Sequence, residues 1–394
     1  MGDISAVKRW MGLAVLAAVL SAGVSGCGLF SSDTTRPPSP LPEFEPTLKV
    51  SEVWSRSVGD GIDDLYLRFY PLVVSDRIYA TDHEGRVVAL DREDGSRLWT
   101  TSLDVNIGAG VNGDDEVVAV GTQDGEVIAL NAEDGKVLWR RELSSEVMAL
   151  SPIDLGILVA RTNDSRVYGL EAESGEIVWQ SSQTAPLLLL RGQSRPVVDT
   201  GRAVIGYDSG KLVALSVVRG NLLWKLTVDV PEGASELERM VDIDGRIRIR
   251  DGIIYAVAYQ GKIGAVALAD GRLLWSREFS SYAGLDVDDD YVYVTDDEGR
   301  VWALDRITGG SVWKQDQLTY RQVTAPVVVG DFVVVADFEG YVHWLDKEDG
   351  RFVARRRVDS DGVLAAPVAR DWRVYVLGNG GTLSVLEPRF GDEG

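Results

Sequence analysis

Cysteine and histidine are nearly absent from this sequence, which has one cysteine and two histidines among 394 residues. A single cysteine excludes an internal disulfide, and so few sulfur and imidazole groups exclude the usual zinc sites. Basic residues are also outnumbered, because 40 lysines and arginines stand against 61 aspartates and glutamates, for a formal net charge of −21. Such a charge disfavours nucleic acid as a partner and suits proteins with basic patches. We expect no metal, no cofactor and no nucleic acid.

The long apolar run near the N-terminus, Trp10 to Val24, is too short to span a bilayer. It follows the basic pair Lys8 and Arg9, as the apolar region of a signal peptide does. It ends in small residues directly before Cys27, and this pattern resembles a bacterial lipobox. We therefore predict a signal peptide over residues 1–26 and lipidation of Cys27. The alternative is an ordinary signal peptide with an incidental cysteine.

Gly28 follows the cysteine, where lipoproteins retained in the inner membrane have aspartate. This resemblance places the chain at the outer membrane, on the periplasmic face, held by its lipid. The segment Ser31 to Thr47 holds five prolines, which is typical of an extended tether. We expect a lipidated tether over residues 27–48 and one folded domain over 49–394.

From Trp54 onward the chain repeats with a period of about 40 residues, the size of a four-stranded propeller blade. In most copies a glycine turn precedes a strand similar to Val-x-Ala-Leu, a second glycine marks the next turn, and a tryptophan follows on the outer strand. The seventh copy has alanine where the tryptophan is expected, and the eighth stops before that position. We expect each indole to pack between neighbouring blades. Proline recurs where the innermost strand should begin, at Pro71, Pro196, Pro326 and Pro367. The copies are Gly85–Trp99, Gly125–Trp139, Ser165–Trp179, Gly210–Trp224, Gly261–Trp275, Gly299–Trp313, Gly340–Ala354 and the shortened Gly381–Gly391.

The two ends of the repeat array complement each other. The eighth copy stops before its outer strand, and the segment around Trp54 has an outer-strand sequence with no blade before it. Pairing the two leaves no exposed edge at the ends of the array. The sequence therefore predicts an all-β protein, an eight-bladed β-propeller of four-stranded antiparallel blades closed by its N-terminal strand. An open solenoid is the alternative.

The pattern Gly-x-Val-x-Ala-Leu-x₄-Gly-x₃-Trp resembles the repeat of quinoprotein dehydrogenases. With the lipobox, the proline tether and eight copies, the chain from residue 27 to 394 resembles the BamB family of outer-membrane assembly lipoproteins. This resemblance implies a non-catalytic scaffold of the β-barrel assembly (BAM) complex. It implies the periplasmic domains of BamA as partner, nascent outer-membrane proteins as further partners, and help in folding and inserting outer-membrane β-barrels.

The resemblance also implies which residues contact BamA. In the family pattern, two leucines flank one residue before an arginine, and two aspartates flank another residue. In this sequence, these positions are occupied by Leu188, Leu190, Arg191, Asp242 and Asp244. The sequence departs from the family pattern at Leu189, which adds an apolar residue.

The same region is distinctive without any family. The stretches from Trp179 to Gly210 and from Trp224 to Gly261 are longer than usual and consecutive, although Trp54 to Gly85 is also long. We expect the extra residues before the inner strands of blades four and five. An apolar run beside an arginine, next to an acidic loop, is typical of an interface. The alternative is that the leucines belong to a strand in the core.

Two other functions remain as alternatives, a quinone-cofactor dehydrogenase and a ligand-sensing propeller. By resemblance the dehydrogenase commonly needs a vicinal disulfide, which one cysteine does not allow. His83 and His343 lack a nucleophile pattern and are interpreted as surface or packing residues. The aspartates at 286 and 288–290 suggest calcium, but they lack the glycine and the terminal glutamate of an EF-hand, and we expect a solvated turn.

Overall fold

The computed structural model describes residues 36–63, 65–182, 194–207, 210–227, 243 and 245–390. The chain divides into two units, Met1–Pro38 and Ser39–Gly394, and all strands belong to the second unit. Every regular element among these residues is a β-strand. No helix in the described part of the chain has the length and apolar character needed to cross a membrane.

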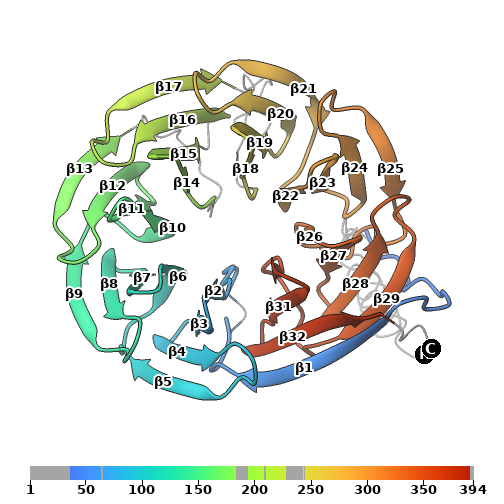
Figure 1. Ribbon diagram of the computed structural model, residues 1–394, viewed down its shortest axis with the longest axis horizontal. Coiled ribbons are helices and arrows are strands. Elements are labelled where there is room, and N and C mark those ends of the chain that lie inside the picture. The colour runs from blue at the N-terminus through green and yellow to red at the C-terminus, as the bar shows by residue number, and fades with distance from the viewer. Residues whose placement is uncertain are drawn as a thin grey trace, which may run out of the picture. The chain divides into compact units, whose positions relative to one another are not determined.

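Eight four-stranded antiparallel sheets stand around a common centre, and within a blade the strands follow chain order from the inside of the ring outward (Figure 1). Blades one to four consist of β2 (Leu72–Val74), β3 (Arg77–Thr81), β4 (Arg86–Asp91), β5 (Arg97–Ser102), β6 (Ile107–Gly113), β7 (Val117–Thr122), β8 (Glu126–Asn131), β9 (Val137–Glu142), β10 (Val147–Asp154), β11 (Ile157–Thr162), β12 (Arg166–Glu171), β13 (Ile177–Ser182), β14 (Val197–Asp199), β15 (Arg202–Tyr207), β16 (Lys211–Ser216) and β17 (Leu222–Thr227).

Blades five to eight continue the same order with one exception, which is the outer strand of blade eight. They consist of β18 (Arg248–Arg250), β19 (Ile253–Val257), β20 (Gly261–Ala267), β21 (Leu273–Phe279), β22 (Gly284–Val287), β23 (Tyr291–Thr295), β24 (Val301–Asp305), β25 (Ser311–Gln315), β26 (Val327–Val329), β27 (Phe332–Ala336), β28 (Tyr341–Asp346), β29 (Phe352–Arg357), β30 (Val368–Arg370), β31 (Arg373–Leu377), β32 (Thr382–Arg389) and β1 (Lys49–Ser57).

The ring closes where β1 pairs with β32. The two strands are antiparallel, and their register runs from Lys49 opposite Arg389 to Ser57 opposite Thr382. Trp54 lies opposite Val385, in the outer-strand place that the eighth repeat leaves open. In Figure 1 the first and last strands of the propeller lie side by side at the joint. This confirms the predicted eight-bladed, all-β propeller and its closure by the N-terminal strand.

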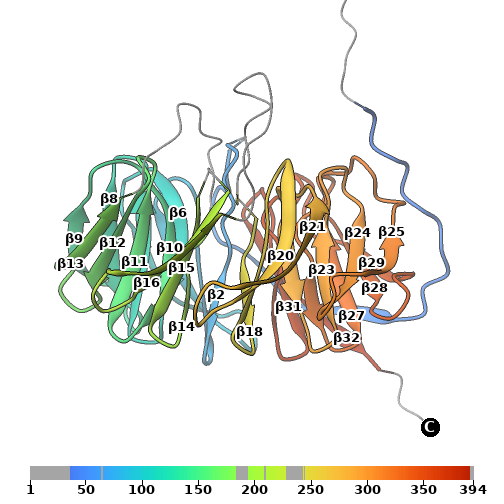
Figure 2. The same ribbon diagram turned by 90° about the horizontal axis from the view of Figure 1, so that it is seen from above.

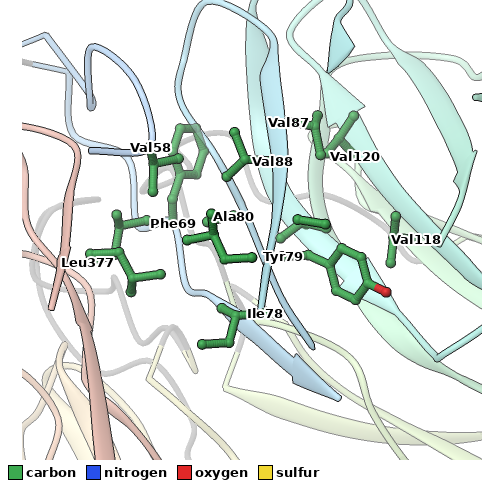
Figure 3. Packing of buried hydrophobic residues seen from close by; sticks show 14 of the residues in the cluster. Val58, Phe69, Ile78, Tyr79, Ala80, Val87, Val88, Val118, Val120 and Leu377 are labelled. Atoms are coloured by element: carbon green, nitrogen blue, oxygen red, sulfur yellow. The ribbon is translucent and has the colours of Figure 1, made fainter. Parts of the chain in front are cut away.

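The core is built from the middle two strands of each blade, whose side chains pack against the next blade. β3 and β4 bury nearly all their residues, because both faces of a blade are covered by neighbours. At the closing joint, Val58 and Leu377 meet Ile78 and Ala80, and the same cluster continues through Val118 of blade two (Figure 3). One chain of apolar contacts therefore joins the last, first and second blades.

Seven tryptophans connect seven of the eight pairs of neighbouring blades, in the position that the repeat predicted. The Trp54 indole N–H donates to the Arg92 carbonyl of blade one at 3.2 Å. Six further joints repeat this bond with N···O distances of 2.6–3.0 Å. They are Trp99 to Ala132, Trp139 to Ala172, Trp179 to Val217, Trp224 to Leu268, Trp275 to Arg306 and Trp313 to Lys347. Because the donor is satisfied, the large ring is buried without an unpaired polar group.

The second glycine of the repeat is required by the tryptophan of the preceding blade. Gly95 has a φ of +69°, and a Cβ there would come within 2.6 Å of the Trp54 ring. Any other residue would combine backbone strain with a steric clash. The glycine and the tryptophan are thus two halves of one joint between blades.

Blade seven exchanges the two residues that form this joint elsewhere. In blades one, two, four, five and six an alanine on the third strand lies opposite the tryptophan on the fourth. In blade seven the third strand carries Trp344, opposite Ala354 on the fourth. Trp344 is fully buried, and its indole N–H has no hydrogen-bond partner. The missing outer tryptophan is thus replaced from the neighbouring strand, with the loss of one hydrogen bond between blades.

The proline-rich segment contacts blade seven from Ser39 onward. The Phe44 ring stacks on Phe352 with centroids 5.4 Å apart, and Arg355 donates to the Pro42 carbonyl at 2.7 Å. The Ser39 carbonyl accepts a hydrogen bond from Arg321 at 3.0 Å. Within residues 27–48, predicted as a tether, the part from Ser39 therefore packs on the propeller.

A buried polar network lies beneath this segment. His343 is fully buried on β28, and its Nε2 lies 3.0 Å from Oδ2 of Asp337, which also accepts from Arg321 at 2.8 Å. Nδ1 of the same ring accepts from Arg355 at 3.2 Å. Burial lowers the pKa of His343 and outweighs Asp337, which would raise it. The interpretation of His343 as a packing residue is confirmed.

Candidate functional site: the loop face and the central channel

One face of the ring carries all the connections from an outer strand to the next inner strand, because each blade has four antiparallel strands. We call it the loop face. Residues 103–106 and 143–146 make short connections, whereas residues 183–196 and 228–247 make long ones before β14 and β18. The extra residues therefore precede the inner strands of blades four and five, as expected. The connection from β1 to β2, residues 58–71, is also long.

The residues predicted to contact BamA lie outside the described residues, as does Cys27. They are Leu188, Leu190, Arg191, Asp242 and Asp244. Their roles stay predictions, and so does the alternative that the leucines belong to a strand.

Ile243 is the one described residue of the acidic pattern, and it is fully buried. It packs with Trp224 of blade four and Ile247 and Ile254 of blade five. On the other side it lies against Gly206 of β15, where a Cβ would come within 2.7 Å of Cγ2 of Ile243. The isoleucine therefore anchors this connection in the joint between the two blades. Sequence reasoning did not find this anchor, although a single apolar residue between two aspartates was a signal for it.

Residues 58–71 cover part of the channel mouth on the loop face. Backbone N–H groups of Val58 and Ile62 donate to blade eight, at the Gly381 and Asn379 carbonyls. Arg68 donates to the Tyr282 carbonyl, which precedes blade six, at 3.1 Å. This stretch therefore contacts blade eight and the connection before blade six. Its Tyr66 and Tyr70, together with Tyr282, line a cavity of about 290 Å³.

The inner strands of the blades stand around the centre of the ring, which we call the central channel, and β2 and β18 are two of them in Figure 2. Each predicted proline lies directly before such a strand, since β2, β14, β26 and β30 begin one residue after Pro71, Pro196, Pro326 and Pro367. Three arginines, Arg195, Arg246 and Arg248, line a cavity of about 250 Å³ within the channel. The sequence analysis did not single them out, because they are far apart in the chain and belong to no motif.

The expected solvated turn of aspartates is correct only for Asp289 and Asp290, which are exposed. Asp286 belongs to β22 and is buried, with Oδ1 2.7 Å from Nε of Arg248. Burial alone would raise the pKa of Asp286, but Arg248 and Arg246 outweigh it and hold the pKa below its usual value.

Asp288 is also buried, contrary to the expected solvated turn, and its carboxylate is bound by two other side chains. It accepts a hydrogen bond from the Tyr293 hydroxyl at 3.0 Å and forms an ion pair with Lys347 at 3.1 Å. The alternation of a strand explains why acidic residues close in sequence have different surroundings. Among the described residues, no group of three or more potential metal-ligating acidic, cysteine or histidine side chains gathers in one place.

Known proteins resemble this chain over most of its length. The family described as "Outer membrane protein assembly factor BamB" matches residues 53–315. The protein of that name from Pseudomonas aeruginosa is 52% identical over 375 residues, which cover 95% of this chain and 98% of the relative. The one from Escherichia coli is 37% identical over 371 residues, covering 91% and 95% respectively.

Solved structures extend the likeness to the fold. BamB from Moraxella catarrhalis superposes with a TM-score of 0.78 at 28% identity, covering 86% of this chain and 100% of that one. A europium-containing methanol dehydrogenase has a TM-score of 0.70 at 14% identity, covering 86% and 93%, which is a likeness of fold alone. The family match, the identities over nearly full length and the shared propeller lead to one conclusion: this chain belongs to the family of outer membrane protein assembly factor BamB.

Proposed function

We propose that this chain is a non-catalytic scaffold lipoprotein of the BAM complex, which binds periplasmic domains of BamA and assists the folding and insertion of outer-membrane β-barrel proteins. The observation that carries the proposal is the 52% identity to BamB of Pseudomonas aeruginosa over 95% of this chain. Lipidation at Cys27 would hold the propeller at the periplasmic face of the outer membrane.

The geometry supports this function through the rigidity of the ring. A closed propeller presents its loops from a framework in which every blade is fixed by two neighbours. The connections 183–196 and 228–247 are consecutive and precede adjacent inner strands, β14 and β18. Ile243, within the second connection, is buried in the joint between blades four and five. The two connections therefore begin and end at adjacent positions of the ring, where one partner can meet both.

The absence of catalysis is part of the proposal. The dehydrogenases with this fold commonly hold their quinone beneath a vicinal disulfide, which a chain with Cys27 as its sole cysteine does not form. Titration of the protein with calcium and a quinone cofactor, followed by absorbance, is expected to show no bound chromophore. A bound chromophore would contradict the scaffold function.

Nascent barrel proteins would be further partners, at the outer edges of the blades. Strands such as β9 and β13 have no neighbour on their outer side among the described strands, and they expose apolar side chains. Leu138 and Val178 are 45% and 50% exposed, and equivalent positions on other blades repeat the pattern. An extended chain could add to such an edge through backbone hydrogen bonds.

The proposed BamA contact is tested by capture of BamA with point variants of the tagged full-length lipoprotein. We expect Arg191→Ala and Asp242→Ala each to weaken capture by about tenfold or more, since each removes a charged group from an interface. Arg219→Ala and Glu173→Ala are matched controls, because both residues are exposed in turns on the opposite face of the ring. Equal recovery of BamA with all four variants would refute the site.

A further inference from the structure

The centre of the ring holds a cavity of about 250 Å³ to which six of the eight blades contribute. It shares Tyr70 with the cavity at the channel mouth on the loop face. Its described lining residues are Tyr70, Pro71, Leu72, Val73, Asn112, Pro152, Ser194, Arg195, Pro196, Val197, Arg246, Ile247, Arg248 and Val368.

Positive charge exceeds negative charge in this cavity. Of its three arginines, Arg248 is paired, through its bond to Asp286 at 2.7 Å. Arg195 lies over the Tyr70 ring, 4.3 Å from the centroid, and Arg246 donates to the Pro367 carbonyl at 3.4 Å. Neither of these two guanidinium groups has a carboxylate within ion-pair distance among the described residues. In a protein with a net charge of −21, two such arginines side by side require an explanation.

The surroundings disfavour the charged form of both arginines. Burial, and after it the nearby charge of Arg248, lowers the pKa of Arg246 to about 9. Burial also lowers the pKa of Arg195, and Arg248 adds to this effect. A negative group in the cavity would remove both penalties, because it favours the charged form of each side chain.

A neutral donor stands beside the two arginines. Ser194 is 2% exposed, lines the cavity, and its hydroxyl has no hydrogen-bond partner. A buried polar group without a partner costs about 1–3 kcal/mol, and a ligand oxygen in the cavity would accept its hydrogen bond. Arg195 follows Ser194 directly in the chain, so one ligand group can meet both.

The remaining wall is apolar and narrows the class of ligand. Leu72, Val73, Val197, Ile247 and Val368 line the cavity beside the donors. Guanidinium groups match the planar, two-oxygen geometry of a carboxylate, and the aliphatic wall favours a hydrocarbon body. The volume is below that of most drug-sized sites, which favours a ligand of few atoms. We infer that the channel binds a small monocarboxylate with a short apolar body, held by Arg195, Arg246 and Ser194.

This inference goes beyond the proposed function and does not depend on it. It is tested by calorimetric titration of the full-length lipoprotein in nonionic detergent, with hexanoate, hexanamide and inorganic phosphate as probes. Hexanoate should bind, and hexanamide, which has the same body without the charge, should bind at least about tenfold more weakly, as expected when a charge-assisted bond is lost. Phosphate should also bind more weakly, because it leaves the apolar wall exposed to water.

Variants separate the site from binding to the detergent or the surface. Arg195→Gln should weaken hexanoate binding by about tenfold or more, since one charge-assisted bond to the ligand is lost. Arg246→Lys should weaken it less, because the charge remains and only the forked donor is lost. Arg219→Gln, on an exposed turn, is the matched control and should bind as the unchanged protein does.

Three results would overturn the inference. They are no hexanoate binding by the unchanged protein, equal binding by Arg195→Gln with an unchanged melting temperature, and equal binding of hexanamide. Phosphate binding as tight as hexanoate binding would overturn the apolar part of the assignment.

Discussion

A tryptophan at a blade joint supplies both packing and a specific hydrogen bond. The indole of Trp139 covers Gly175 of the next blade, and its N–H donates to the Ala172 carbonyl at 2.8 Å. Because the bond is buried, its loss would leave a carbonyl and a donor unpaired. In blade seven, Trp344 provides a buried indole without this hydrogen bond.

The exchange in blade seven predicts a coupled pair of mutations. Trp344→Ala should lower the free energy of unfolding by about 3–5 kcal/mol, because it leaves a large cavity. Ala354→Trp in the same chain should restore part of this loss, since the double variant recreates the arrangement of five other blades. Urea unfolding of the two single variants and the double variant measures the coupling, and strictly additive effects would contradict it.

The buried His343 predicts a pH dependence of stability. Its pKa is lowered in the folded protein, so the folded state binds fewer protons than the unfolded chain. Its contribution is therefore complete above the unfolded pKa of 6.5 and is lost as the pH falls toward the lower folded value.

Thermal unfolding at several pH values between about 7.5 and 5 measures this loss for His343. Because Asp337 is an acid whose pKa is also lowered, its own effect belongs to a more acidic range. His343→Gln is the comparison variant and should show a flatter pH profile in this window. An equal slope in both proteins would mean that the ring is not the group that titrates.

The sequence predicted the residues that recur in the repeat, but it did not predict the residues that only the fold brings close together. The tryptophans and glycines were found because they recur at a fixed spacing. Arg195, Arg246 and Asp286 come from three different blades, and nothing in their local sequence indicates that they meet in one channel. Asp286 and Asp288 were predicted to be exposed, because consecutive acidic residues usually lie in solvent.

Among the elements, β1 decides whether the ring is closed. Eight of its nine residues pair with β32, and the strand places Trp54 at the joint to blade one. Without β1, both the edge of β32 and the apolar cluster at this joint would be exposed. The segment before it adds contacts to blade seven through Phe44.

Stepwise N-terminal deletions of the mature chain test the role of β1. Removal of residues 28–38 should lower the melting temperature least, since the contacts of Ser39, Pro42 and Phe44 remain. Removal of 28–48 should lower it moderately, and removal of 28–57 should cause the largest loss. Trp54→Ala in the full chain is the milder companion variant, with an expected loss of about 3–5 kcal/mol. Equal stability of the 28–48 and 28–57 deletions would contradict closure by β1.

The order of the strands was predictable, whereas the packing of the segment before them was not. Periodic glycines and tryptophans mark where strands begin and end, and two incomplete ends specify the closure. Proline-rich composition indicates an extended segment, but it does not reveal that Phe44 stacks on Phe352. That contact depends on a partner more than three hundred residues away.

In the whole molecule, the repeats make the fold predictable, and the proposed functional segments are those that interrupt the repeat. The long connections 183–196 and 228–247 interrupt the period, and so does 58–71 at the channel mouth. The family was predictable from the repeat together with the lipobox pattern and the proline-rich segment, whereas the contact residues in these interruptions stay predictions. The cationic channel was not predictable, because a ring of blades brings its lining together only after it closes.

The central claim is that the chain is a lipid-anchored scaffold bound to BamA. The most direct measurement is purification of the tagged full-length protein from detergent-solubilised outer membranes, beside a Cys27→Ser variant. We predict that BamA co-purifies with the unchanged protein, and that Cys27→Ser is largely lost from the membrane fraction, since its lipid anchor is missing. Outer-membrane protein purified intact without BamA would contradict the account.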